Sequence, residues 1–106
     1  MSDKSVILIN LLKAKPGQQA ALIALLKQNT ETVIRTLQGW KTTRLIAAGD
    51  GVGVVIYSEW HTAAAVAAMR ADARMKAYFP KILELASLDS VMGAAVWSES
   101  RSGGGR

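Results

Sequence analysis

Apolar residues occupy neighbouring positions, rather than alternate ones, in three short segments of the chain. Residues 5–13, 52–60 and 91–98 are rich in valine, isoleucine, leucine or alanine, and such runs are typical of β-strands buried on both faces. A fourth segment, 40–48, has a weaker and more polar pattern. Because the glycine-containing link 49–51 is short, we predict that 40–48 and 52–60 form an antiparallel hairpin.

A longer segment, 18–37, has the repeat of a helix that buries one side. Gly39 follows it, and glycine readily adopts the left-handed conformation that ends many helices. The predicted buried stripe consists of Leu22, Leu26, Asn29, Val33 and Leu37.

Two more helices are predicted after the hairpin. Thr62 is a candidate N-cap for the alanine-rich segment 63–71, and Asp72 is a candidate N-cap for 73–85. Pro80 is expected to distort or divide the second of these helices, because proline has no backbone N–H to donate.

The resulting order is strand, helix, strand, strand, helix pair, strand. This order is that of a ferredoxin-like βαββαβ domain of the α+β class, with an antiparallel sheet and its helices on one face. A chain of 106 residues accommodates one domain. We place that domain at residues 1–98 and a flexible, glycine-rich tail at 99–106.

Both faces of the predicted sheet are apolar. In the first strand, Leu8 and Leu12 point to one face, while Ile7 and Ile9 point to the other. The helices can cover only one face, and burying one more isoleucine or valine contributes about 1.5–3 kcal/mol. We therefore predict that the second face packs against the sheet of another copy in a two-fold homodimer. The alternative is a monomer with an exposed apolar face.

Composition narrows the classes of function. The absence of cysteine excludes disulfides, thiolate nucleophiles and cysteine-bound metals. The formal charge is +5, but the basic residues are scattered and are not interleaved with aromatic ones, which argues against a nucleic-acid partner. No leader pattern and no apolar stretch of roughly 20 residues is present. We expect a cytoplasmic protein that does not bind membranes.

Three segments, ILINLLKAKPGQQAALIALL, LQGWKTTRL and VVIYSEWHTAAAV, resemble the antibiotic biosynthesis monooxygenase family. The likeness covers roughly residues 4–98 and rests on a Pro-Gly turn, a Gly-aromatic pair before the second strand and a tryptophan that ends the third. The resemblance implies a dimeric α/β barrel in which each subunit has a pocket between sheet and helices. It also implies the activities of that family, namely cofactor-independent anthrone oxygenation, quinol oxygenation or haem degradation.

The same resemblance assigns candidate site residues. Trp60 matches a pocket tryptophan of the anthrone oxygenases, whereas the asparagine, histidine and tyrosine of those enzymes correspond here to Ile56, Ile46 and Val66. In the haem-degrading branch, Asn10 matches a pocket asparagine.

The other two residues of that branch are missing. Met69 stands where it has a tryptophan, and Phe79 stands where it has the histidine that binds iron. Because haem would have no evident axial ligand, haem degradation is not the expected activity.

Asn10 and Trp60 are the candidate residues for orienting and stabilising a substrate oxyanion. Asn10 lies on a strand face that should be buried, so its amide needs a partner; that partner is either a ligand oxygen or a neighbouring backbone group or water. The indole of Trp60 either fills the core or donates its N–H into the cavity.

Arg44 and His61 are the candidate assisting residues. Arg44 either holds an anionic substrate or lies on the surface, and His61, the single histidine, is either a base or a solvated loop residue. One histidine and eight scattered carboxylates form no recognisable metal site, and no cofactor is expected. The predicted residues that line the substrate cavity are Ile56, Tyr57, Met69, Tyr78 and Phe79.

The expected function is therefore cofactor-independent monooxygenation of an aromatic, phenolic, polyketide-like or quinol substrate with O2. Such chemistry needs an apolar, water-poor cavity and hydrogen-bond donors on the developing oxyanion. The alternative is a dimer of the same fold that binds or senses a small molecule without catalysis.

Overall fold

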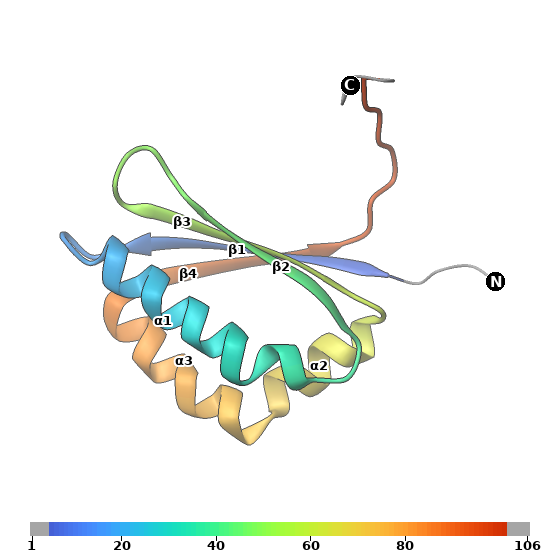
Figure 1. The fold of residues 1–106 in the computed structure, drawn as a ribbon, viewed down its shortest axis with the longest axis horizontal. Coiled ribbons are helices and arrows are strands. Elements are labelled where there is room, and N and C mark those ends of the chain that lie inside the picture. Colours follow the sequence, from blue (N-terminus) through green and yellow to red (C-terminus); the bar gives the residue numbers. More distant parts are fainter. Residues whose placement is uncertain (1–4, 102–106) are drawn as a thin grey trace.

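The computed structural model describes residues 5–101, which form a four-stranded antiparallel sheet with its helices on one face (Figure 1). The sheet order is β2-β3-β1-β4. The elements follow one another as β1 (Val6–Ala14), α1 (Gln19–Thr32), the 3-10 turn η1 (Ile34–Thr36), β2 (Trp40–Ala47), β3 (Gly53–Trp60), α2 (Ala63–Ala71), α3 (Ala73–Leu85) and β4 (Ala86–Gly93).

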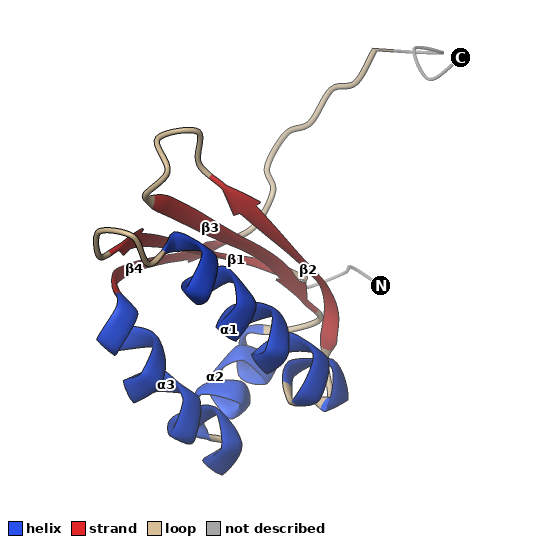
Figure 2. Cartoon of the chain, turned by 60° about the vertical axis from the view of Figure 1, so that its left-hand side comes forward, coloured by secondary structure: helices blue, strands red, loops and turns tan. Residues whose placement is uncertain are grey.

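This arrangement confirms the predicted α+β, ferredoxin-like fold. β2 and β3 form the expected antiparallel hairpin, and β1 lies between β3 and β4. Figure 2 shows α1 and α3 in front of the sheet, with α2 nearer to one end. None of the helices between residues 5 and 101 combines the length and apolar character that a membrane span requires.

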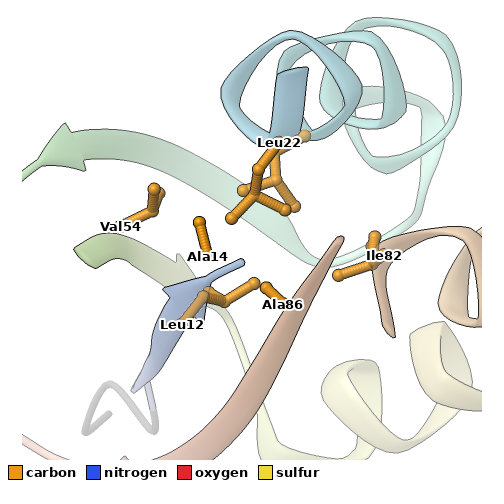
Figure 3. Close-up of a cluster of buried hydrophobic side chains, with 7 residues drawn as sticks. Leu12, Ala14, Leu22, Val54, Ile82 and Ala86 are labelled. Atoms are coloured by element: carbon orange, nitrogen blue, oxygen red, sulfur yellow. The ribbon is translucent and has the colours of Figure 1, made fainter. Parts of the chain in front are cut away.

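The helix-facing side of the sheet carries two separate groups of buried side chains. In the first group, side chains from α1 and from the C-terminal part of α3 pack against one end of β1, β3 and β4 (Figure 3). The second group lies at the other end of the sheet, around Trp60 and α2. The first group consists of Leu12, Ala14, Leu22, Leu26, Val54, Ile82 and Ala86, and the second of Leu8, Val33, Trp60, Val66, Met69 and Met75.

α1 ends earlier than its apolar stripe predicts. The helix stops at Thr32, and the segment that follows is the 3-10 turn η1. Thr30 and Thr32 each donate a side-chain hydrogen bond to the carbonyl four residues before, at 3.0 and 2.8 Å. Such bonds compete with the helical pattern, and β-branched residues weaken it further.

The caps of α2 and α3 are those predicted. Thr62 accepts a hydrogen bond of 3.0 Å from the Ala65 N–H, and Asp72 accepts one of 2.8 Å from the Arg74 N–H. The Arg74 side chain also bonds Asp72, and these partners hold the pKa of the Asp72 carboxyl below its usual value. Pro80 lies inside α3, which continues through it as one helix, so of the two expected effects the division of the helix does not occur.

The last strand was placed too late in the sequence. It was predicted at 91–98, but β4 spans Ala86–Gly93 and begins directly where α3 ends. Gly93 pairs with Ile7, and β1 begins at Val6, so the neighbouring strand offers almost no further partner beyond this point. Trp97, which lies in the segment predicted as the last strand but beyond the end of β4, is 76% exposed. Of the predicted tail 99–106, residues 102–106 lie outside the described part of the chain.

The face of the sheet opposite the helices carries exposed apolar side chains. Leu11 of β1, Ile46 of β2 and Val91 of β4 lie on this open face, and all three are exposed. Figure 1 shows this face free of helices, with the C-terminal segment departing on its side. Both faces of the sheet therefore carry large apolar side chains, as the sequence predicts, and the open face also carries charged ones such as Arg44 and Glu59.

Gly39 enters a conformation that other residues rarely adopt, with φ of 88°, and a Cβ at this position would lie 2.5 Å from Cβ of Ala65. Gly39→Ala should therefore destabilise the domain by about 2 kcal/mol or more, from strain and overpacking together. Urea unfolding measures this loss. Gly17→Ala is the control, because Gly17 also has a positive φ but no atom within 4 Å of the added Cβ. Equal losses in the two variants would show that contact with Ala65 contributes nothing.

Candidate functional site

A cavity of about 470 Å³ lies between the sheet and the helices. Its walls include members of both buried groups, so it occupies the region between them. The cavity is large enough for a small organic ligand of several rings. The lining residues are Leu8, Asn10, Leu12, Leu26, Asn29, Ile34, Thr43, Ile56, Ser58, Trp60, Met69, Arg70, Met75, Phe79, Ile82, Leu83, Leu88 and Ser90.

Asn10 projects from the centre of β1 on the helix-facing side. Its pairing partner on β4 is Ser90, whose hydroxyl donates a hydrogen bond to Asn10 Oδ1. This bond fixes the orientation of the amide. The oxygen is held by Ser90, and the Nδ2 group can donate to another acceptor. A neighbouring side chain is thus one partner of Asn10, and the amide also lines the cavity.

Trp60 ends β3 and is 1% exposed. Its indole N–H donates to Ser58 Oγ at 3.1 Å, and Ser58 Oγ lies 3.3 Å from the Leu8 carbonyl oxygen, to which it donates. The indole therefore forms part of the cavity wall, and its N–H already has an acceptor within the protein. Of the two roles expected for this indole, the structure agrees with the filling of the core, since the N–H bonds Ser58 rather than pointing free into the cavity.

Asn29 lies on the buried side of α1, between Leu26 and Val33 of the two core groups. It lines the cavity and is 3% exposed, and its Oδ1 is buried without a hydrogen-bond partner. The sequence placed Asn29 in the buried stripe but gave it no role. An amide at a position where the pattern calls for leucine was the available signal.

Arg70 is the one charged residue among the described residues that line the cavity. It lies in the last turn of α2 and is exposed, so its guanidinium brings positive charge to the rim of an otherwise apolar space. Nothing in the local sequence pattern distinguishes Arg70 from the other scattered basic residues. The interpretation missed that the short α2 crosses one end of the sheet and turns its last residues towards the cavity.

Of the other predicted lining residues, Ile56, Met69 and Phe79 line the cavity. Tyr78 packs against both core groups from outside the cavity, with its hydroxyl 3.3 Å from the Thr32 hydroxyl. His61 is exposed after β3 and does not line the cavity.

Arg44 and Tyr57 lie on the open face and do not line the cavity. For Arg44 this is the surface position that was one of its two expected places, whereas the prediction that Tyr57 lines the cavity was wrong. They pair with each other across β2 and β3, one residue out of step with Ile56 and Ser58 of the cavity side. A bulge between Trp40 and Thr42 shifts the alternation of β2.

The Tyr57 hydroxyl has a partner on the open face. It donates to Glu59 Oε2 at 2.7 Å, and this bond raises the pKa of Tyr57.

Within residues 5–101, no three His, Cys, Asp or Glu side chains come together as a metal site.

The chain belongs to the antibiotic biosynthesis monooxygenase family, whose model matches residues 5–81. Among curated proteins it is similar to tetracenomycin-F1 monooxygenase from Streptomyces glaucescens, with 35% identity over 72 residues. That alignment covers 68% of this chain and 64% of the relative, so the chain matches somewhat less than two thirds of the relative's length.

Solved structures show the same fold. SnoaB, described as a cofactor-independent oxygenase from Streptomyces nogalater, superposes with a TM-score of 0.82 at 15% identity, covering 92% of this chain and 97% of that one. Rv0793 from Mycobacterium tuberculosis superposes with a TM-score of 0.79 at 22% identity, covering 92% and 100%. At these identities the likeness defines the fold rather than the reaction.

Ser58→Ala should leave the buried indole N–H of Trp60 without an acceptor and cost about 1–3 kcal/mol of unfolding free energy. In a Trp60→Phe background the same substitution should cost less by about 1 kcal/mol, because the donor is already gone. Chemical unfolding of the four proteins measures the coupling. Strictly additive losses would contradict the hydrogen-bonded role of Ser58.

Proposed function

We propose that this protein is a cofactor-independent monooxygenase that oxidises an aromatic, phenolic substrate with O2. The observation that carries the proposal is the apolar cavity in which Asn10 and Arg70 are placed where they can stabilise negative charge on a bound ring. Family membership supports an oxygenase role, and the tetracenomycin-F1 relative suggests a polyketide-like substrate.

The proposed reaction uses the substrate itself as the reductant. A ring CH2 group conjugated with phenolic oxygens loses one proton, and the resulting carbanion transfers an electron to O2. Radical and superoxide combine to form a C–O bond, and a proton completes the hydroperoxide. Loss of water from that hydroperoxide breaks the O–O bond and leaves a carbonyl, so one oxygen atom enters the product and the other leaves as water.

The cavity supports the charged intermediate in two ways. The Nδ2 group of Asn10, oriented by Ser90, is a donor for the developing oxyanion. The guanidinium of Arg70 attracts the same charge from the rim, and because this side chain is exposed, solvent screens part of the attraction. Trp60, Met69 and Phe79 contribute apolar surface that excludes water from the ring.

A second candidate function has one observation in its favour. No carboxylate or imidazole occurs among the described residues that line the cavity, so no protein base is in place to remove the substrate proton. A chain that only stores or senses an aromatic ligand would need no such base. An oxygenase with this lining depends on substrates acidic enough to ionise when Asn10 and Arg70 stabilise their anions.

Oxygen consumption with a panel of anthrones and hydroquinones, in the presence of a metal chelator, tests the enzyme against the binding protein. The oxygenase should consume one O2 for each substrate converted, and Asn10→Ala should lower kcat by about tenfold to a hundredfold. Lys76→Ala, at an exposed position of α3 outside the cavity, is the matched control. Tight binding of panel members without turnover of any of them would favour the binding protein.

We also propose that the open face of the sheet packs against a second copy of the chain. Three large apolar side chains are exposed there, and Val91 is 61% exposed. Burying each of them fully would contribute about 1.5–3 kcal/mol. The described residues offer no helix that covers this face (Figure 1), and an isologous contact between two such faces would bury it.

Sedimentation at micromolar concentration should give a dimer. Ile46→Lys should shift it towards the monomer, because a charge would be buried in the apolar contact. Ala24→Lys, on the exposed side of α1, should leave the mass unchanged. A wild-type chain that sediments as a stable monomer would contradict the proposal.

A further inference from the structure

Asn29 is a polar residue that the ligand-free protein leaves unsatisfied. Its Oδ1 is buried and has no hydrogen-bond partner, and the residue is 3% exposed. Leu26, one turn earlier on α1, and Val33, one turn later, are both buried core residues. An isolated amide in such surroundings destabilises the fold, because it has given up water without gaining a partner.

Several other polar side chains on the cavity wall have partners inside the protein. Ser58 and Trp60 bond each other, and Asn10 accepts from Ser90. Thr43 accepts from the indole N–H of Trp40 at 2.8 Å. Among residues 5–101, Asn29 Oδ1 is the one fully buried side-chain oxygen or nitrogen without a partner, and the residue that carries it lines the cavity.

We propose that Asn29 is a specificity-determining residue that hydrogen-bonds a hydroxyl group of the ligand. An amide presents both an acceptor and donors, and a hydroxyl can pair with either. The inference rests on the proposed function only in placing an aromatic ligand in this cavity.

The position of Asn29 also defines the kind of ligand. Asn10 belongs to the sheet and Asn29 to the helix layer, so the two amides address the ligand from opposite walls. The matching substrate class is a planar polycyclic phenol with one oxygen towards the sheet and a hydroxyl towards α1. An apolar ring without that hydroxyl leaves the buried amide unpaired and is discriminated against.

Binding of two matched probes tests this role without any turnover. 2-Naphthol and 2-methylnaphthalene differ by a hydroxyl in place of a methyl, and quenching of tryptophan fluorescence reports their binding. Wild-type protein should bind 2-naphthol about tenfold more tightly than 2-methylnaphthalene, relative to their partitioning into octanol. In Asn29→Leu, whose side chain has the same number of heavy atoms, this preference should fall by about threefold or more, and only the part due to Asn10 should remain.

Gln28→Leu is the matched control, since it makes the same type of change at an exposed position of the same helix. It should keep the wild-type preference. Equal affinity of the wild type for the two probes, no measurable binding of either, or an unchanged preference in Asn29→Leu would overturn the proposal. Equal affinity is also the outcome expected if water alone satisfies Asn29.

Thermal unfolding of the ligand-free proteins supplies an independent measurement. Asn29→Leu should raise Tm by about 4–8 °C, because it removes an unpaired buried amide, whereas a structural role would make the variant less stable. A fall in Tm would overturn the proposal. A hydroxyl preference that depends on Asn29, found in a protein that consumes no oxygen, would leave the inference standing and reject the oxygenase.

Discussion

The structure depends on how the helices cover one face of an apolar sheet. α1, α2 and α3 bury the two ends of that face in separate groups, one around Leu22 and the other around Trp60. The space between them remains a cavity rather than continuous core. Packing energy is thus concentrated at the ends of the sheet, and the middle is left for polar groups that a filled core would exclude.

The fold could be predicted from the sequence, whereas the site could be predicted only in part. Strand and helix order follows from short apolar runs, from Gly39 and from the caps Thr62 and Asp72, all of which act locally. The position of β4 does not follow from such local signals. The segment after α3 has only weak β-propensity, but it leaves the helix beside β1 and pairs with that strand. The more apolar segment that follows has almost no strand left to pair with, and tertiary context overrides its propensity.

The site shows the same limit at the level of single residues. Alternation along β1 and β3 correctly placed Asn10, Ile56 and Trp60 on one side of the sheet. It could not place Arg44, since one bulge in β2 exchanges the faces of every residue after it. Hydrogen-bond pairing is also invisible in sequence, so it could not be predicted that the N–H of Trp60 is bonded to Ser58 or that the Oδ1 of Asn29 has no partner.

Asp72 connects two walls of the cavity through one residue. It is both the C-cap of α2 and the N-cap of α3, and its own backbone is extended. Met69 and Arg70 precede this joint, Met75 and Phe79 follow it, and Figure 1 shows the two helices meeting at an angle beneath the sheet. Because this joint lies outside the sheet, the backbone angles of one residue set the angle between the two helices, and with it the width of this part of the cavity.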